Sequence, residues 1–297
     1  MNLHVMKTFC DLVDTGSFSR AAESNYISQS AVSQQVAKLE DELGVQLVAR
    51  GGTRISATDA GKTFYQGAKS ILRRYEKLLG EVKSVSDEVR GVLRVGTIYS
   101  VGFYLLDPYV RRFFEQHPEV DLHVTYTNWN HINAAILGGE MDLGVVACPH
   151  RDRSLENSPM FNEELVMVCP PEHRLAGRET ISPSELEGES FSAFEENIPT
   201  QREIDRRLRA ARVRVRVETV FDNIELLKRS LMVRGGVSIL PRKNVEAEAE
   251  RGDLWIATLE DDKPWTRPVA VLRKRGQAAS PAEQKFLDIL RSDPEEK

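Results

Sequence analysis

Residues 18–44 read FSRAAESNYISQSAVSQQVAKLEDELG, which indicates two short helices joined by a polar turn. In the second helix, apolar residues recur at steps of four, three and four and so share one buried face: Val32, Val36, Leu39 and Leu43. The opposite face carries small polar and amide side chains with one lysine: Gln29, Ser30, Ser33, Gln34 and Lys38. Amides and hydroxyls can read base edges in the major groove of DNA, and a lysine can contact phosphate. The stretch predicts a helix-turn-helix that binds specific DNA sequences.

The residues around the second helix support this prediction. Ser28 is a suitable N-cap and Gly44 a suitable helix stop, while Ala21-Ala22 permits close helix crossing. After it, residues 47–61 read LVARGGTRISATDAG, in which Gly51-Gly52 is a tight-turn signal between short apolar strands.

We therefore expect a hairpin wing beside the helix-turn-helix, and its candidate DNA contacts are Arg50, Thr53 and Arg54. The alternative is an amphipathic three-helix subdomain with no nucleic-acid partner.

With these motifs, residues 3–64 resemble the N-terminal winged helix-turn-helix of the LysR-type transcriptional regulators. The resemblance rests on Phe9, Gly16-Ser17-Phe18, Ala21-Ala22, Ser28-Gln29-Ser30-Ala31-Val32-Ser33, Leu39-Glu40, Leu43-Gly44, Arg50, Arg54 and Thr58-Asp59-Ala60-Gly61. The chain departs from the family pattern at Ser30, Leu47 and Ala57, where proline, phenylalanine and leucine are usual. These departures concern the operator sequence rather than the binding mode.

Length and charge fit this interpretation. A chain of 297 residues predicts two or three domains. The net charge of −5 is uneven: residues 1–90 hold 12 Lys and Arg against 11 Asp and Glu, and the remainder holds 28 against 34. We expect no membrane segment and no signal region. Three widely spaced cysteines fit a reducing compartment, so the cytoplasm is the expected location.

Residues 61–90 predict a dimerisation helix. Apolar residues at alternating steps of four and three form a heptad seam: Phe64, Ala68, Ile71, Tyr75, Leu78, Val82, Val85 and Val89. Such a seam needs a partner, either a second copy or the chain's own domain. The resemblance implies a linker helix that pairs two subunits, commonly within a tetramer, so a homodimer or homotetramer is expected.

Residues 91–297 alternate between strand and helix patterns, which predicts α/β lobes built on mostly parallel sheet. The expected organisation is multi-domain: a winged helix-turn-helix at 1–60, a linker helix at 61–90 and a two-lobed effector domain at 91–297. Lobe I takes about 91–162 and 268–297, and lobe II about 163–267, with the chain crossing near 161–164 and returning near 266–270. The resemblance implies a periplasmic-binding-protein-like fold with a small-molecule effector between the lobes.

Ligands of such sheets bind beyond the carboxyl ends of the strands. The candidate effector residues there are Thr97, Tyr99, Ser100, Val101, Thr127, Thr200, Gln201, Phe221 and Asn223. For Thr97, Ser100, Thr200 and Gln201, the alternative role is to cap helices. The arginine-rich run 202–216 is interpreted as a solvated helix face followed by a strand, with a second nucleic-acid patch as the alternative.

Other functional classes have weaker support. Cys148 with His150 and Cys169 with His173 are the candidate metal ligands, but buried cysteines usually act as small hydrophobes. No catalytic set, metal or cofactor is expected. The sequence thus predicts a transcriptional regulator whose partners are double-stranded DNA, a second copy of itself and, as a further candidate, RNA polymerase. The alternatives are a metabolite sensor whose N-terminal domain binds protein, and an enzyme on the two-lobed fold.

Overall fold

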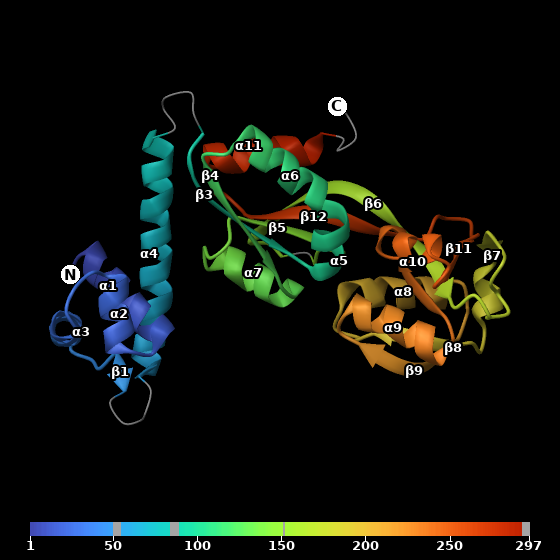
Figure 1. Cartoon of the computed structure of the whole chain (residues 1–297), viewed down its shortest axis with the longest axis horizontal. Helices are drawn as coiled ribbons and strands as arrows, with labels where there is room; N and C mark the ends of the chain where they lie inside the picture. The colour runs from blue at the N-terminus through green and yellow to red at the C-terminus, as the bar shows by residue number, and fades with distance from the viewer. Residues whose placement is uncertain (50–54, 84–88, 151, 293–297) are drawn as a thin grey trace. The chain divides into compact units, whose positions relative to one another are not determined.

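The computed structural model describes residues 1–49, 55–83, 89–150 and 152–292. It divides into two compact units (Figure 1): Met1–Val92 with residues 119–121 and 138–140, and the rest of the chain from Leu93.

The N-terminal unit is a helix-turn-helix with a small hairpin and one long helix. Its elements are α1 (Leu3–Thr15), α2 (Phe18–Ser24), α3 (Gln29–Leu43), β1 (Val48–Ala49), β2 (Ser56–Ala57) and α4 (Asp59–Lys83). Its core joins the inner faces of α1, α2 and α3 to the hairpin: Phe9, Leu12, Ala21, Ala22, Val32, Val36, Leu39, Leu47 and Val48. Leu43 was expected on this face, but it lies in the last turn of α3 and is 41% exposed.

Local sequence signals fix the ends of these helices. Asn2, Ser17 and Ser28 each accept a hydrogen bond from a first-turn amide, and Gly44 ends α3 in the left-handed conformation. β1 and β2 pair antiparallel, so the expected hairpin is present, although residues 50–54 at its tip lie outside the described residues. At the start of α4, Gly61 lies so close to the chain that an added Cβ would be 2.0 Å from the Leu47 carbonyl oxygen.

The apolar seam of α4 has two parts. Phe64 and Ala68 pack against the helix-turn-helix core, as the own-domain alternative proposed. The next members are exposed in the single chain: Ile71, Tyr75, Leu78 and Val82. The described part of α4 runs to Lys83. Val85 lies outside the described residues, and Val89 lies in non-helical chain.

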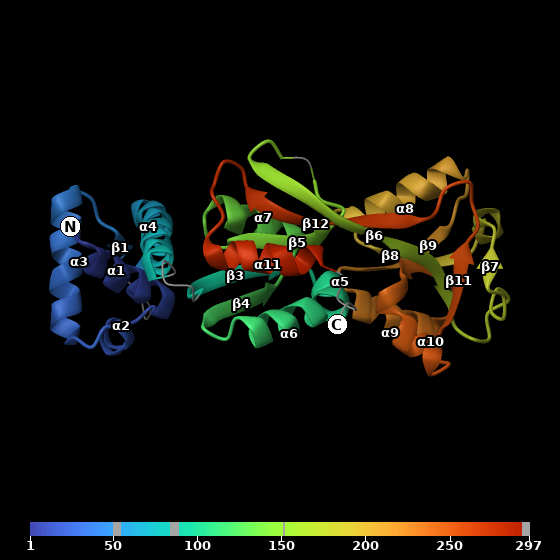
Figure 2. The ribbon, with the colours of Figure 1, turned by 90° about the horizontal axis from the view of Figure 1, so that it is seen from above.

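The C-terminal unit has two lobes (Figures 1 and 2). The first lobe holds β3 (Gly91–Thr97), α5 (Tyr99–Val101), the π-helix η1 (Gly102–Leu106), α6 (Asp107–Gln116), β4 (Val120–Tyr126), α7 (Trp129–Leu137), β5 (Leu143–Ala147) and α11 (Pro281–Arg291). The second holds β7 (Thr180–Ile181), η2 (Pro183–Leu186), β8 (Ser190–Phe194), α8 (Pro199–Ala210), β9 (Arg216–Phe221), α9 (Ile224–Arg234), β10 (Ser238–Pro241), η3 (Arg242–Asn244), α10 (Glu246–Glu250) and β11 (Trp255–Leu259).

Two long strands, β6 (Leu155–Cys169) and β12 (Thr266–Lys274), run through both lobes. The strand order of the main sheet is β4-β3-β5-β12-β6-β11-β7, with β10 also pairing β6. β3 and β5 are parallel, and so are β8 and β9, but β12 is antiparallel to both β5 and β6. The sheet is therefore mixed rather than mostly parallel. The chain passes from the first lobe to the second on β6 and returns on β12, which pairs antiparallel with β6.

Candidate nucleic-acid interface and ligand pocket

The outer face of α3 presents all five side chains that the sequence analysis selected. Gln29, Ser30, Ser33, Gln34 and Lys38 are exposed, whereas the inner face is anchored in the core. The Ser28 Oγ caps the helix by accepting from the Ala31 amide, and it lies 2.9 Å from the Ser30 Oγ. The face is thus a row of exposed amides and hydroxyls on a capped helix, which is the chemistry needed to read base edges.

The turn before α3 adds an aromatic ring that the sequence analysis did not select. Tyr26 is 97% exposed and has a positive φ of 54°. The wing candidates Arg50, Thr53 and Arg54 lie outside the described residues.

A cavity of about 570 Å³ lies within the C-terminal unit. Its walls come from the carboxyl ends of β3, β5 and β8, and from the first turns of α7, α8 and α9. Polar side chains from both lobes line it, with the rings of Tyr99, Trp129 and Phe194 between them. It has the size and composition of a small-molecule site.

Five of the nine predicted effector residues line this pocket: Tyr99, Ser100, Thr127, Thr200 and Asn223. The other four do not, for identifiable reasons. The buried Thr97 donates its hydroxyl proton to the Val145 carbonyl oxygen, and Val101 is buried in the first lobe. Gln201 accepts from the Phe194 amide and donates to Asp205, so it braces α8. Phe221 lies instead in a shallow groove between β9 and α9.

Arg267 is the most buried of the pocket residues that the sequence analysis did not select. It is 1% exposed, and both its Nε and its Nη2 lie 2.7 Å from Oε2 of the equally buried Glu163. Its Nη1 donates to Ser100 Oγ (3.2 Å) and Thr200 Oγ1 (3.1 Å). Burial raises the pKa of Glu163, against the opposing effect of the Arg267 guanidinium.

The surroundings of the three cysteines disfavour the thiolate form. Burial raises the pKa of Cys10 and Cys148 to about 11, and that of Cys169 to about 12. The thiolate is the nucleophile and metal ligand, so these environments favour the inert thiol. Among the described residues, no group of three or more potential metal ligands comes together.

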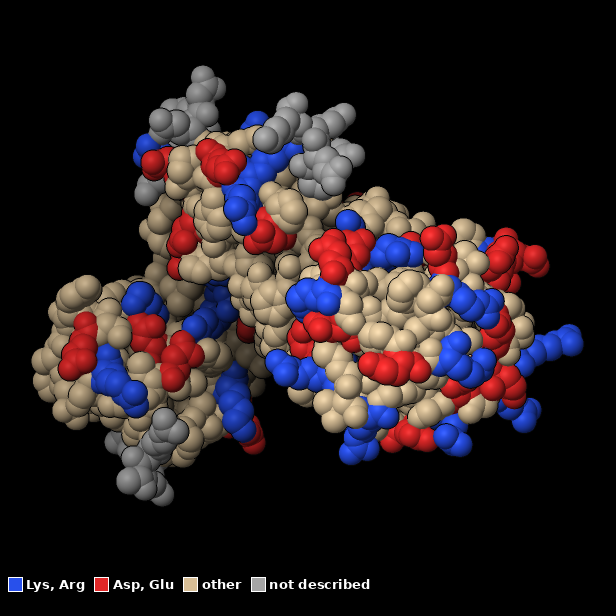
Figure 3. Space-filling model, turned by 45° about the vertical axis from the view of Figure 1, so that its right-hand side comes forward, with Lys and Arg blue, Asp and Glu red and all other residues tan. Residues whose placement is uncertain are grey.

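The arginine-rich run behaves as a solvated face. Arg206 and Arg207 pair with Glu203, and Arg216 pairs with Glu218. Figure 3 shows Lys and Arg interspersed with Asp and Glu over the visible face, without a broad field of one sign. Within the described residues, no helix combines the length and apolar character needed to cross a bilayer.

A helix-turn-helix with an exposed amide face and a separate two-lobed ligand domain defines a DNA-binding transcriptional regulator. Two family models match the chain: "Bacterial regulatory helix-turn-helix protein, lysR family" over residues 3–62, and "LysR substrate binding domain" over residues 86–294. The chain belongs to the LysR family, as the sequence resemblance predicted. It is therefore a DNA-binding regulator with an effector-binding domain, and not an enzyme.

Similar proteins agree with this assignment over the whole chain. The RuBisCO operon transcriptional regulator of Allochromatium vinosum is 29% identical over 300 residues, covering 99% of this chain and 96% of that protein. The hydrogen peroxide-inducible genes activator of Pectobacterium carotovorum subsp. carotovorum is 24% identical over 291 residues, covering 98% and 96%. The crystal structure of full-length CbnR complexed with its target DNA has the same fold, with a TM-score of 0.75, 20% identity and coverage of 98% and 99%.

Proposed function

We propose that this regulator reads its operator through Gln29, Ser30, Ser33 and Gln34 of α3, and that its effector is a small organic acid bound in the pocket between the lobes. The hydroxyl pair of Ser100 and Thr200 beneath Arg267 carries the ligand assignment. The exposed part of the α4 seam supports self-association through that helix. Transcriptional control also leads us to propose RNA polymerase as a further partner and the cytoplasm as the location.

The hydroxyl pair favours a ligand that accepts hydrogen bonds. Arg267 donates to both oxygens, so each hydroxyl has its own proton left to donate to another acceptor, such as a ligand in the pocket. Thr200 also lies within hydrogen-bonding reach of Cys148, but a thiol sulfur is a weak acceptor and a carboxylate would displace it. Thr200 is the second residue of α8, where unpaired amides and the helix dipole favour negative charge.

The other residues that line the pocket restrict the chemical class of the effector further. Glu195 and Asp222 lie at exposed positions, where they can accept from donors on the far end of a ligand. Tyr99 and Trp129 supply flat walls. The pocket therefore favours a compact acid that carries hydroxyl or amino groups away from its carboxylate.

A thermal-shift screen of the full chain tests this assignment. A panel of small carboxylic acids is compared with the corresponding neutral amides, and binding to the native state raises the unfolding midpoint. We expect acids but not amides to raise it, and Thr200→Val to abolish the increase. Thr125→Val, at an exposed position of β4, is the matched control and should keep it. Equal stabilisation by acids and amides would contradict the proposal.

The peroxide response named for one relative has no support in this chain. A peroxide sensor needs an accessible thiolate, whereas burial raises the pKa of all three cysteines well above neutrality. We therefore propose effector binding rather than cysteine oxidation as the signal.

A further inference from the structure

A buried lysine lies where the two lobes of the C-terminal unit meet. Lys228 of α9 is 1% exposed, and its Nζ donates to Tyr104 Oη (2.8 Å), the Asn244 carbonyl oxygen (2.9 Å) and Glu248 Oε1 (3.0 Å). Its fourth neighbour is Glu225 Oε1, at 3.1 Å. Burial opposes the charged form, but these hydrogen bonds hold the pKa of Lys228 above its ordinary value. The ammonium thus remains charged, and its surroundings are built to hold it.

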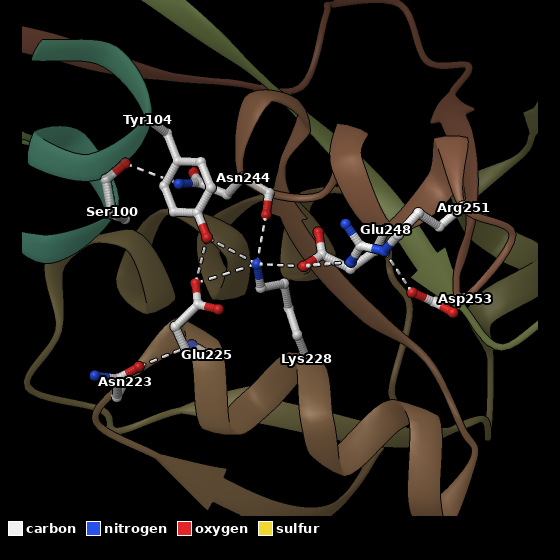
Figure 4. A network of polar contacts seen from close by, with 9 residues as sticks. All are labelled: Ser100, Tyr104, Asn223, Glu225, Lys228, Asn244, Glu248, Arg251 and Asp253. Atoms are coloured by element: carbon white, nitrogen blue, oxygen red, sulfur yellow. Dashed lines mark hydrogen bonds and ion pairs between the residues drawn. The ribbon is translucent and has the colours of Figure 1, made fainter. Parts of the chain in front are cut away.

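The partners of Lys228 come from both lobes (Figure 4). Tyr104 belongs to η1 of the first lobe, whereas Glu225, Asn244 and Glu248 belong to the second. The Tyr104 hydroxyl accepts from Lys228 and donates to Glu225, and the Lys228 Nζ lies 5.0 Å from the centre of the Tyr104 ring. One side chain of the first lobe is therefore held by two charged groups of the second.

The same network reaches the floor of the pocket through Asn244, which is fully buried. Its carbonyl oxygen accepts from Lys228, its Nδ2 donates to the Ser100 carbonyl oxygen (2.8 Å), and its Oδ1 accepts from Arg267 (3.4 Å). Ser100 and Tyr104 lie one helical turn apart on the continuous α5–η1 segment. A displacement of Ser100 therefore moves Tyr104 with it.

The arrangement can open without stranding a buried charge. If Tyr104 withdraws, Lys228 keeps Asn244 and Glu248, and its third proton can turn to Glu225, which is already within ion-pair distance. Glu225 likewise keeps a cationic partner when it loses the Tyr104 hydroxyl. Buried charges are costly only when they lose all partners, so the contact between the lobes is reversible while the second lobe stays intact.

We infer that Tyr104 and Lys228 form a reversible latch between the lobes, and that this latch holds the Ser100 turn in its pocket-lining position. The coupling to an effector rests on the proposed function, because Ser100 is one of the proposed ligand contacts. The latch itself does not depend on the identity of the ligand.

Hydrogen–deuterium exchange of the full chain without ligand tests the latch. Tyr104→Phe removes the hydroxyl but keeps the ring, and the loss of hydrogen bonds to two charged groups should accelerate exchange in residues 99–106 roughly 10- to 100-fold. The first turn of α9 should exchange faster as well, while α11 and the N-terminal unit keep their rates. Tyr126→Phe is the matched control, because Tyr126 stacks on the neighbouring Phe103 and its hydroxyl takes no part in the latch.

Unchanged exchange in residues 99–106 overturns the latch, and so does a uniform acceleration over the whole unit, which indicates a general structural role. Lys228→Met provides the second arm, and Tyr104→Phe combined with it should accelerate exchange no further than Lys228→Met alone. Additive acceleration would show that the two residues act independently and would contradict the latch. These exchange experiments contain no ligand, so neither outcome bears on the organic-acid proposal. The thermal-shift screen tests that proposal separately.

Discussion

Replacing Leu78 of α4 with aspartate should break self-association of the full chain. Ile71, Tyr75, Leu78 and Val82 form the outward stripe, with exposed fractions of 48%, 43%, 46% and 62%. Burying a whole leucine side chain yields about 1.5–3 kcal/mol, so the exposed half of Leu78 contributes about 1 kcal/mol. In a twofold-symmetric dimer both subunits carry the substitution, so the loss doubles to about 2 kcal/mol. The cost of burying two carboxylates adds to this loss.

This loss corresponds to a dissociation constant at least about 30-fold higher. Sedimentation equilibrium of the full chain measures it directly. Gln66→Asp is the matched control, because it adds the same charge at an exposed position of α4 outside the apolar stripe. A dissociation constant for Leu78→Asp within about threefold of the parent value would remove α4 from the interface and refute the reasoning.

Two further outcomes follow from the structure. Ser33→Arg combined with Gln34→Ala should change the DNA half-site that the protein selects from random DNA. Both residues lie on the exposed face of α3, where their side chains can contact bases. Selection of the parental half-site would exclude both residues from base recognition. The Arg242 guanidinium, hydrogen-bonded to Glu164, lowers the pKa of that carboxyl from 4.5, so the pair stabilises the fold above that pH and the contribution is lost as the pH falls through the lowered value. Urea unfolding between about pH 3 and pH 6 should therefore depend less steeply on pH in Glu164→Gln, and an identical slope would contradict the pairing.

Local signals were enough to predict the N-terminal unit. The buried face of α3 repeats at helical spacing, and Ser28 and Gly44 mark its ends through interactions within a few residues. The prediction for Leu43 was wrong, because periodicity indicates which face of a helix is apolar but not how much of that face is covered. Periodicity likewise could not separate Phe64 and Ala68, which the chain covers itself, from the exposed members of the same seam.

The pocket was only partly predictable because its floor is assembled from distant strands. Ser100 and Thr200 follow strands, and such positions can be selected from the sequence alone. Arg267 lies on β12 and is hydrogen-bonded to Glu163 on β6. The two residues are neighbours only because of the register in which β6 and β12 pair, and the sequence does not show that register. A usable signal existed: an arginine within the β-rich run 266–274 is rarely buried unless a carboxylate faces it.

The antiparallel pair β6–β12 determines what kind of movement an effector can cause. Backbone pairing runs from Leu155–Lys274 to Glu164–Thr266, with one register shift between Val269 and Ala270. Sliding one lobe past the other would break these hydrogen bonds, whereas a change in strand twist preserves them. The register shift at Val269–Ala270 is where such a twist is absorbed most easily, because a bulge interrupts the ladder locally. We therefore expect the two lobes to move by rotation about the β6–β12 pair, a change in angle rather than in the distance between them.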